Sequence, residues 1–162
     1  MPELPEVETT VRALSVILNQ KIIKVKIHTK KLRFNIPHNI KNILINSKIS
    51  NIRRIAKYII IDLNKKYSLI IHLGMSGRLK NISYKHHLNK HDHFIIYLNN
   101  QNILIYNDPR KFGFIDVVKT KDLNKKKYIN NLGIDALSPK LEKQFVFEKI
   151  CKSEVPIKQI LL

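Results

Sequence analysis

The stretch YIIIDLNKKYSLIIHL, residues 58–73, contains two short apolar runs separated by Asn64-Lys65-Lys66. Isoleucine and tyrosine are enriched in β-strands, because branched and aromatic side chains pack well on a pleated surface. Asparagine is common in turns, since it tolerates the backbone angles that a tight reversal needs. The stretch therefore predicts two antiparallel strands joined by a short turn.

The same pattern continues on both sides of this pair. Turn-prone breaks stand at Asn99-Asn100 and Asn107-Asp108-Pro109. Nearer the N-terminus, apolar residues alternate with basic ones at Ile23, Val25 and Ile27, which is typical of a half-buried strand. Further strands are expected over 49–55, 94–98 and 103–106. Short, mostly antiparallel strands at this spacing predict a β-sandwich or a barrel.

Helical patterns lie at the two ends of the chain. Val7, Val11, Leu14 and Leu18 form an apolar stripe, which predicts a helix from about Pro5 to Asn19. Further helices are expected over 37–46, 122–130 and 138–152, the last with Ser138 as its N-cap and Pro139 at its first position. The predicted fold class is α+β, a two-layer antiparallel β-sandwich flanked by an N-terminal helix and C-terminal helices. We expect a domain over 1–137 and a helical connection over 138–162.

The composition indicates a polyanionic partner. The 162 residues carry a net charge of +18, with only 12 acidic residues. An AT-rich genome would also favour lysine, but that bias does not explain the shortage of acidic residues. Nucleic acid is therefore the expected partner, ahead of a membrane. An acidic N-terminus and the lack of a long apolar run predict a soluble, cytoplasmic protein, expected to be a monomer. The single cysteine, Cys151, excludes a disulfide framework and a multi-cysteine zinc site within these residues.

The N-terminal residues offer a nucleophile and an acid. Removal of Met1 would leave Pro2 with a free secondary amine, which is far less protonated at neutral pH than a lysine amine. A neutral amine can attack the sugar C1′ to form an imine, and the neighbouring Glu3 could transfer protons if burial raised its pKa. The alternative is an ordinary chain start in which Pro5 merely opens a helix.

Two basic or glycine-rich segments could contact nucleic acid. Arg53 and Arg54 precede Lys57 at a strand start, where lysine could reach a phosphate or assist the amine chemistry. His72 is followed by a glycine-flanked Met75, and an exposed thioether can enter between DNA bases. The alternatives are a solvated basic turn in the first case and an inward-packed methionine in the second.

Two further segments carry chemically useful side chains. His91 and His93 would share a face of a strand, which makes a metal site conceivable, although a phosphate contact by His91 is favoured. In the Asp-Pro-Arg turn, Arg110 could hydrogen-bond a base edge while Phe112 stacks on a base or wedges between bases. The alternative is a β-turn with Phe112 in the core.

Taken together, the segments resemble the N-terminal domain of bacterial formamidopyrimidine-DNA glycosylase, which excises oxidised purines. The resemblance covers the whole chain and rests on five stretches in order: residues 2–9, 54–58, 72–77, 90–93 and 108–113. Leu4, where the related endonuclease VIII group typically has glycine, favours the purine-directed branch.

The resemblance implies a role for each residue. Pro2 would be the Schiff-base nucleophile, Glu3 the proton donor, and Lys57 the lysine for β-elimination and phosphate contact. The remaining positions would contact double-stranded DNA that holds an oxidised purine or an abasic site: Met75, Arg110 and Phe112 in the gap left by the flipped nucleotide, His72 and His91 beside them, and Lys152 or Lys158 further on. Filling that gap has a physical purpose, because flipping a base costs stacking and pairing energy.

The resemblance also implies that parts of the family's enzyme lie beyond Leu162. These are a helix–two-turn–helix segment and a zinc finger with four cysteines, so no cofactor is expected within this chain. The apolar end from Ile160 to Leu162 suggests truncation and exposed surface. We expect weak, poorly specific activity, and the alternative is a catalytically impaired basic remnant that binds DNA through charge.

Overall fold

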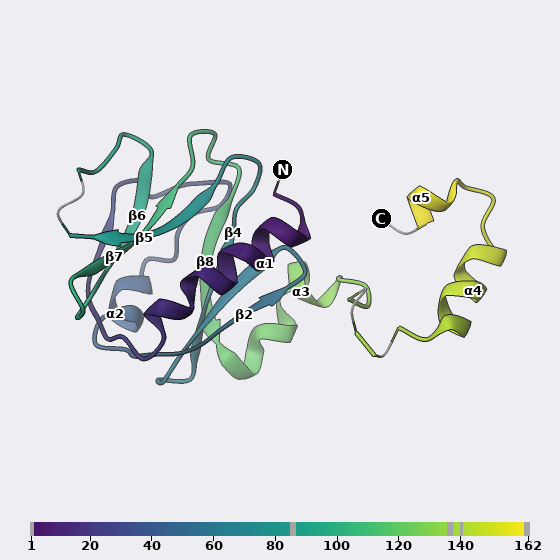
Figure 1. Cartoon of the computed structure of the whole chain (residues 1–162), viewed down its shortest axis with the longest axis horizontal. Helices are drawn as coiled ribbons and strands as arrows, with labels where there is room; N and C mark the ends of the chain where they lie inside the picture. The colour runs from purple at the N-terminus through teal and green to yellow at the C-terminus, as the bar shows by residue number, and fades with distance from the viewer. Residues whose placement is uncertain (1, 85–86, 136–137, 140, 161–162) are drawn as a thin grey trace. The chain divides into compact units, whose positions relative to one another are not determined.

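Two four-stranded antiparallel sheets form the body of the protein in the computed structural model (Figure 1). The structure describes residues 2–84, 87–135, 138–139 and 141–160. One sheet has the strand order β1-β6-β7-β5 and the other β2-β3-β4-β8. The strands are β1 Ile22–Ile27, β2 Ile49–Ile55, β3 Tyr58–Leu63, β4 Tyr67–His72, β5 Arg78–Ser83, β6 Asp92–Leu98, β7 Asn102–Asn107 and β8 Phe114–Lys119.

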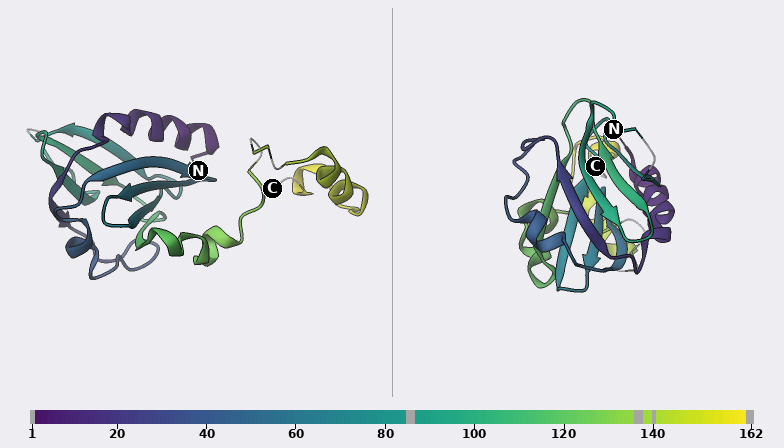
Figure 2. Two further views of the ribbon diagram at one scale, coloured as in Figure 1. Left: turned by 90° about the horizontal axis from the view of Figure 1, so that it is seen from below. Right: turned by 90° about the vertical axis from the view of Figure 1, so that its left-hand side faces the viewer.

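The two sheets pack face to face around one main core (Figure 2). Ile59 and Ile61 of β3 contribute to it from one sheet, and Phe94 and Ile96 of β6 from the other. Residues two apart in a strand share a face, so these alternating positions face the opposite sheet. The predicted fold class, a two-layer antiparallel sandwich with an N-terminal helix and C-terminal helices, is confirmed.

Seven helical segments accompany the described sheets. The first is α1, which contacts β2 and β3 and lies beside β2 in Figure 1. The predicted helix from Pro5 to Asn19 exists in two parts, because the α-helical geometry tightens to 3₁₀ after Ala13. The segments are α1 Leu4–Ala13, η1 Leu14–Ile17, α2 Ile40–Leu44, η2 Thr120–Lys125, α3 Lys127–Asn130, α4 Lys143–Cys151 and α5 Ile157–Ile160.

The prediction that Ile23, Val25 and Ile27 form the inward face of β1 is partly wrong. A register shift between Ile22 and Lys24 interrupts the pairing of β1 with β6. An extra residue at such a bulge moves the following side chains to the other face. Ile22 is therefore fully buried, whereas Ile23 is 46% exposed. Val25 remains in the core, as predicted.

Two strands, β5 and β8, are absent from the strand prediction. β5 lacks a clear period because Leu79 and Ile82 are three residues apart, and polar residues fill the rest. β8 begins directly after Gly113, and its Phe-Ile and Val-Val pairs carried a signal for a strand. Both strands enter the sheets through pairs distant in sequence, β5 with β7 and β8 with β4.

The C-terminal residues form a second compact unit over 131–162, while 1–130 form the first. The division into domains 1–137 and 138–162 stays a prediction. The helix expected from Ser138 begins instead at Lys143 with Glu142 as N-cap, since the Ser138 carbonyl accepts the Leu141 amide in a separate turn. Residues 161–162 and the Ile160 side chain, on which the expected apolar end depends, lie outside the described residues. None of the helices in the described ranges has the length and apolar character needed to cross a bilayer.

Candidate nucleic-acid interface and catalytic edge

The start of α1 places Glu3 beside Lys57. Glu3 is the N-cap, and the Glu6 carboxylate accepts its backbone N–H, which completes a capping box. The Glu3 carboxylate lies 3.4 Å from the Lys57 Nζ atom, with 67% of the Glu3 side chain exposed. Two of the three predicted catalytic residues are therefore in contact. The described residues do not provide the burial on which proton transfer by Glu3 was made conditional.

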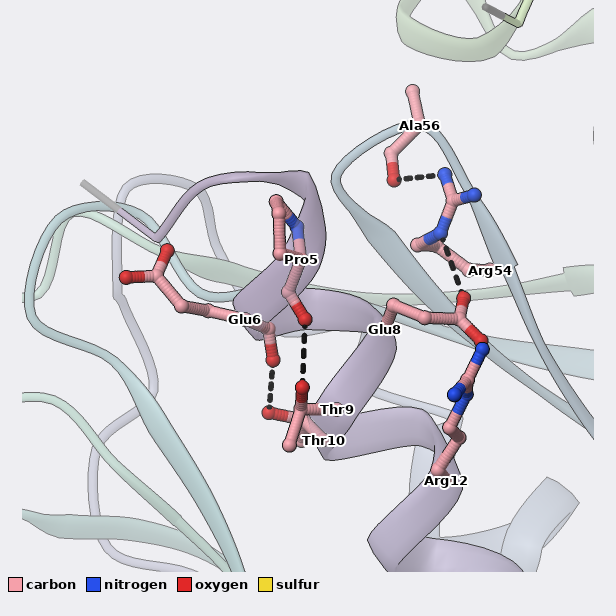
Figure 3. Close-up of polar contacts among 8 residues, drawn as sticks. All are labelled: Pro5, Glu6, Glu8, Thr9, Thr10, Arg12, Arg54 and Ala56. Atoms are coloured by element: carbon pink, nitrogen blue, oxygen red, sulfur yellow. Dashed lines mark hydrogen bonds and ion pairs between the residues drawn. The ribbon is translucent and has the colours of Figure 1, made fainter. Parts of the chain in front are cut away.

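Arg54 ties the turn that carries Lys57 to α1. Its Nε donates to the Glu8 carboxylate at 3.0 Å, and its Nη1 donates to the Ala56 carbonyl at 3.0 Å (Figure 3). Ala56 has φ +47°, in the left-handed region that non-glycine residues rarely adopt. The carbonyl contact therefore holds a strained turn in place, and with it the backbone of Lys57.

Pro2 lines a groove between the start of α1 and the β4–β5 loop. The groove has a volume of about 840 Å³ and is also lined by Glu6, Met75, Ser76 and Pro109. Pro2 and Met75, which are far apart in the sequence, thus border the same open space. A groove is what a nucleophile needs if a nucleotide is to approach it.

His72 ends β4 within an aromatic cluster. Its ring stacks on Phe114 with centroids 5.5 Å apart and lies 5.0 Å from the Tyr58 ring. The Gly74 amide donates to Nδ1 at 3.1 Å, which leaves Nε2 to carry the proton. Burial, followed by the charges of Arg33 and Lys57, lowers the pKa of His72. His72 is therefore a neutral donor at neutral pH, adjacent to Lys57.

Met75, Arg110 and Phe112 are exposed on neighbouring loops. Met75 is 46% exposed and Phe112 is 45% exposed. The alternative that these two side chains pack in the core is therefore wrong. The Arg110 guanidinium lies over the Phe112 ring, 4.5 Å from its centroid. This cation–π pair presents a flat ring and five N–H donors from one loop.

The two histidines before and in β6 differ in their surroundings. His91 lies in the turn before β6, not on a strand as predicted, and it is half-buried. His93 is buried, with Nε2 donating to the Asp108 carbonyl and Nδ1 accepting from Thr29 Oγ1, both at 2.9 Å. Burial is also the main cause that lowers the pKa of His93. With both ring nitrogens occupied, His93 has no lone pair for a metal.

No group of three or more metal-binding side chains occurs among the residues that the structure describes. The family's four-cysteine zinc finger does not fit these residues either, because Cys151 is the one cysteine in the chain. Lys152 is exposed at the C-cap of α4, and Lys158 lies in α5, both within the second unit. Their contact with DNA stays a prediction.

Two residues that join separate segments of the chain, Asp108 and Glu8, were not predicted from the sequence. Asp108, which the sequence predicts only as part of a turn, is fully buried and accepts hydrogen bonds from the β4–β5 and β7–β8 loops. Glu8 of α1 binds Arg54 and Arg12. The Asp-Pro pair directly after a strand was a signal for Asp108. No local pattern pointed to the Glu8–Arg54 pair, whose partners are 46 residues apart.

Comparison with known proteins identifies the family. Residues 1–115 match the family described as formamidopyrimidine-DNA glycosylase N-terminal domain. The chain belongs to this family. It is 44% identical over 163 aligned residues to a formamidopyrimidine-DNA glycosylase of Zymomonas mobilis, covering all of this chain and 60% of that protein. A relative from Rickettsia bellii is 41% identical, with 59% of its length covered.

Solved structures of the family share the fold. The Lactococcus lactis enzyme in complex with DNA containing an abasic site superposes with a TM-score of 0.89 at 30% identity. This match covers 99% of the chain and 60% of that protein. The same enzyme bound to DNA containing Fapy-dG gives 0.88 at 31% identity. The chain thus spans about 60% of the length of the relatives that it matches.

Proposed function

We propose that this chain supplies the catalytic part of a DNA base-excision repair enzyme that removes oxidised purines and then nicks the abasic site. The observation that carries the proposal is the contact of Glu3 with Lys57, next in the chain to Pro2, which lines the groove. Family membership and the solved complexes of the Lactococcus lactis enzyme with damaged DNA support it. The protein would act as a cytoplasmic monomer on double-stranded DNA.

The proposed reaction begins at the Pro2 nitrogen. After removal of Met1, this amine attacks C1′ of the damaged nucleotide, and the glycosidic bond breaks as the oxidised base leaves with a proton from Glu3. The sugar ring then opens to a Schiff base between Pro2 and C1′. Loss of a C2′ proton eliminates the 3′ phosphate, and Lys57 assists this step from its position beside Glu3.

The exposed loops would hold the DNA in the reactive geometry. Met75 and Phe112 would enter the space that the flipped nucleotide vacates, and Arg110 would hydrogen-bond the orphaned cytosine. His72, with Nε2 free to donate, and His91 would bind phosphates nearby. Lys152 or Lys158 would add a contact from the second unit.

A second candidate function is a basic module that binds DNA without catalysis. It is favoured by the net charge of +18 and by the exposure of Glu3, whose side chain is 67% open to solvent. Active sites usually exclude water from their proton donors, and the described residues do not do so for Glu3.

Borohydride trapping separates the two functions. The chain is incubated at low salt with a duplex that contains an abasic site or 8-oxoguanine, and the Schiff base is reduced to a stable covalent adduct. The adduct should be strongly reduced in Pro2→Gly and abolished when an N-terminal extension turns the Pro2 nitrogen into a peptide nitrogen. Lys65→Gln, which changes a lysine outside the groove, should leave it intact. Duplex binding without any adduct would favour the non-catalytic module.

A further inference from the structure

Four predicted DNA-facing residues lie on segments that meet at one buried residue, Asp108. We propose that Asp108 is a positioning residue that locks Met75, His91, Arg110 and Phe112 into a single rigid unit, which enters the DNA as one body. The inference rests on the proposed function, since that function makes these loops DNA-facing.

Both carboxylate oxygens of Asp108 are used. Oδ1 accepts the Ser76 hydroxyl at 2.6 Å and the Arg110 amide at 3.3 Å. Oδ2 accepts the Gly113 amide at 2.9 Å and the Tyr106 hydroxyl at 3.0 Å. Ser76 follows Met75, and Gly113 follows Phe112. The carboxylate therefore joins the β4–β5 loop to both ends of the β7–β8 loop.

The backbone of Asp108 adds the third segment. Its N–H donates to the His91 carbonyl at 3.1 Å, and its carbonyl accepts from His93 Nε2 at 2.9 Å and from the Lys111 amide at 3.2 Å. The start of β6 is thus bound to the same residue. Seven hydrogen bonds converge on Asp108, and each of the four DNA-facing residues is bonded to it or adjoins a residue that is.

The surroundings keep the carboxylate in its accepting role. Asp108 is fully buried, as is the Tyr106 side chain that donates to it. Burial, followed by the charge of Asp108, raises the pKa of Tyr106, so the phenol keeps the proton that it donates. Hydrogen bonds to a buried charged acceptor are stronger than neutral ones and costly to leave unmade.

The backbones of the β4–β5 and β7–β8 loops are packed closely against each other. A Cβ on Gly74, which has φ +64°, would lie 2.4 Å from the Gly113 nitrogen. A Cβ on Gly113 would lie 1.9 Å from the Tyr106 hydroxyl. The two loops therefore touch through backbone atoms, so neither can move toward the other. Because Met75 and Arg110 are already held in place, less conformational entropy would be lost when they enter the DNA.

The test replaces Asp108 by Asn, which turns one carboxylate oxygen into an N–H₂ group facing the Gly113 amide and the Tyr106 hydroxyl. Amide hydrogen exchange of Gly113 and Arg110 is measured without DNA. Exchange should accelerate about tenfold or more relative to the β-sheet amides, because local opening exposes these amides. Preference for a duplex with a stable abasic analogue over an undamaged duplex should fall by a similar factor.

Asp62→Asn is the matched control. Asp62 also accepts a serine hydroxyl at 2.6 Å, from Ser68, and binds Arg53, but it lies in β3 away from the loops. This variant should lose stability without faster exchange at Gly113 and without loss of DNA preference. Ser76→Ala removes the hydroxyl that donates to Asp108 and accepts the Arg110 amide at 3.3 Å, but it leaves the Gly113 amide bonded to Asp108. It should therefore weaken the DNA preference while Gly113 stays protected.

Non-additivity distinguishes positioning from simple stabilisation. Arg110→Ala should reduce the abasic preference of the wild-type chain but cause little further loss in Asp108→Asn. Unchanged exchange at Gly113 in Asp108→Asn would overturn the inference, even if stability falls. A wild-type chain with no preference for the abasic duplex would count against the proposed function alone, since the exchange measurement still decides the role of Asp108.

Discussion

A single guanidinium connects the predicted catalytic lysine to the helix behind the predicted nucleophile. Arg54, whose side chain is 10% exposed, bonds both Glu8 of α1 and the Ala56 carbonyl of the β2–β3 turn. Lysine would be a poor replacement, because its ammonium lacks the planar fork with which the guanidinium reaches both acceptors. The position of Lys57 thus depends on a residue that takes no part in the chemistry.

The Glu8 contact predicts an acid-dependent stability. The Arg54 guanidinium, followed by that of Arg12, holds the pKa of Glu8 below its ordinary value of 4.5. The unfolded chain then binds more protons than the folded one between these two values. The stabilisation is therefore complete above the ordinary value and is lost as pH falls through the lower, folded one.

Arg54→Ala should flatten this dependence. Denaturant unfolding of the wild type from about pH 5 to about pH 3 should show a steeper fall in the free energy of unfolding than the variant shows. Arg53→Ala is the control, because the Arg53 guanidinium binds Asp62 and not Glu8. Equal slopes for the wild type and Arg54→Ala would show that the Glu8 contact contributes nothing to folding.

At the scale of elements, β1 shows how a bulge decides which side chain is buried. Ile22 and Ile23 have identical side chains and adjacent positions, and both precede the register shift or lie within it. Pairing with Leu98 of β6 directs Ile22 into the main core, which leaves Ile23 facing solvent. Alternation alone placed Ile23 inside, because a period of two contains no information about an inserted residue.

Alanine substitution should separate the two isoleucines. Ile22→Ala should cost about 2–5 kcal/mol of unfolding free energy, since it removes buried methyl groups and leaves a cavity. Ile23→Ala should cost less than about 1 kcal/mol, because its side chain is half exposed. Chemical denaturation of both variants measures the difference. A larger loss for Ile23→Ala would mean that the strand pairs without the bulge.

At the scale of the molecule, the proposed association with DNA should depend on charge. The net charge of +18 acts on any duplex and carries no sequence information. The log of the binding constant should fall linearly with the log of salt concentration, with a slope near −0.9 for each phosphate contacted. Titration of a labelled duplex at several salt concentrations checks this. A flat response would contradict the electrostatic basis of the interaction.

Much of the fold could be predicted because strand formation is largely local. The runs in β2, β3, β4, β6 and β7 had the composition and length of strands, and turn-prone residues separated them. β5 was missed since its side chains are mostly polar and its pairing partner β7 is not the next strand in the chain but the one after β6. The start of α4 was misplaced because a Ser-Pro pair is equally suited to open a turn.

The sequence by itself determined the residue types of the candidate site, the sandwich class and the family. These follow from short motifs and from periodic patterns of residues, both of which can be recognised in the sequence without the structure. Only the tertiary structure decided that Glu3 contacts Lys57, that Arg54 bridges α1 to the β2–β3 turn, and that Asp108 joins three loops. Such contacts depend on the register of paired strands and on packing between sheets. Residues dozens of positions apart are therefore brought into contact, and the sequence around each of them gives no indication of that contact.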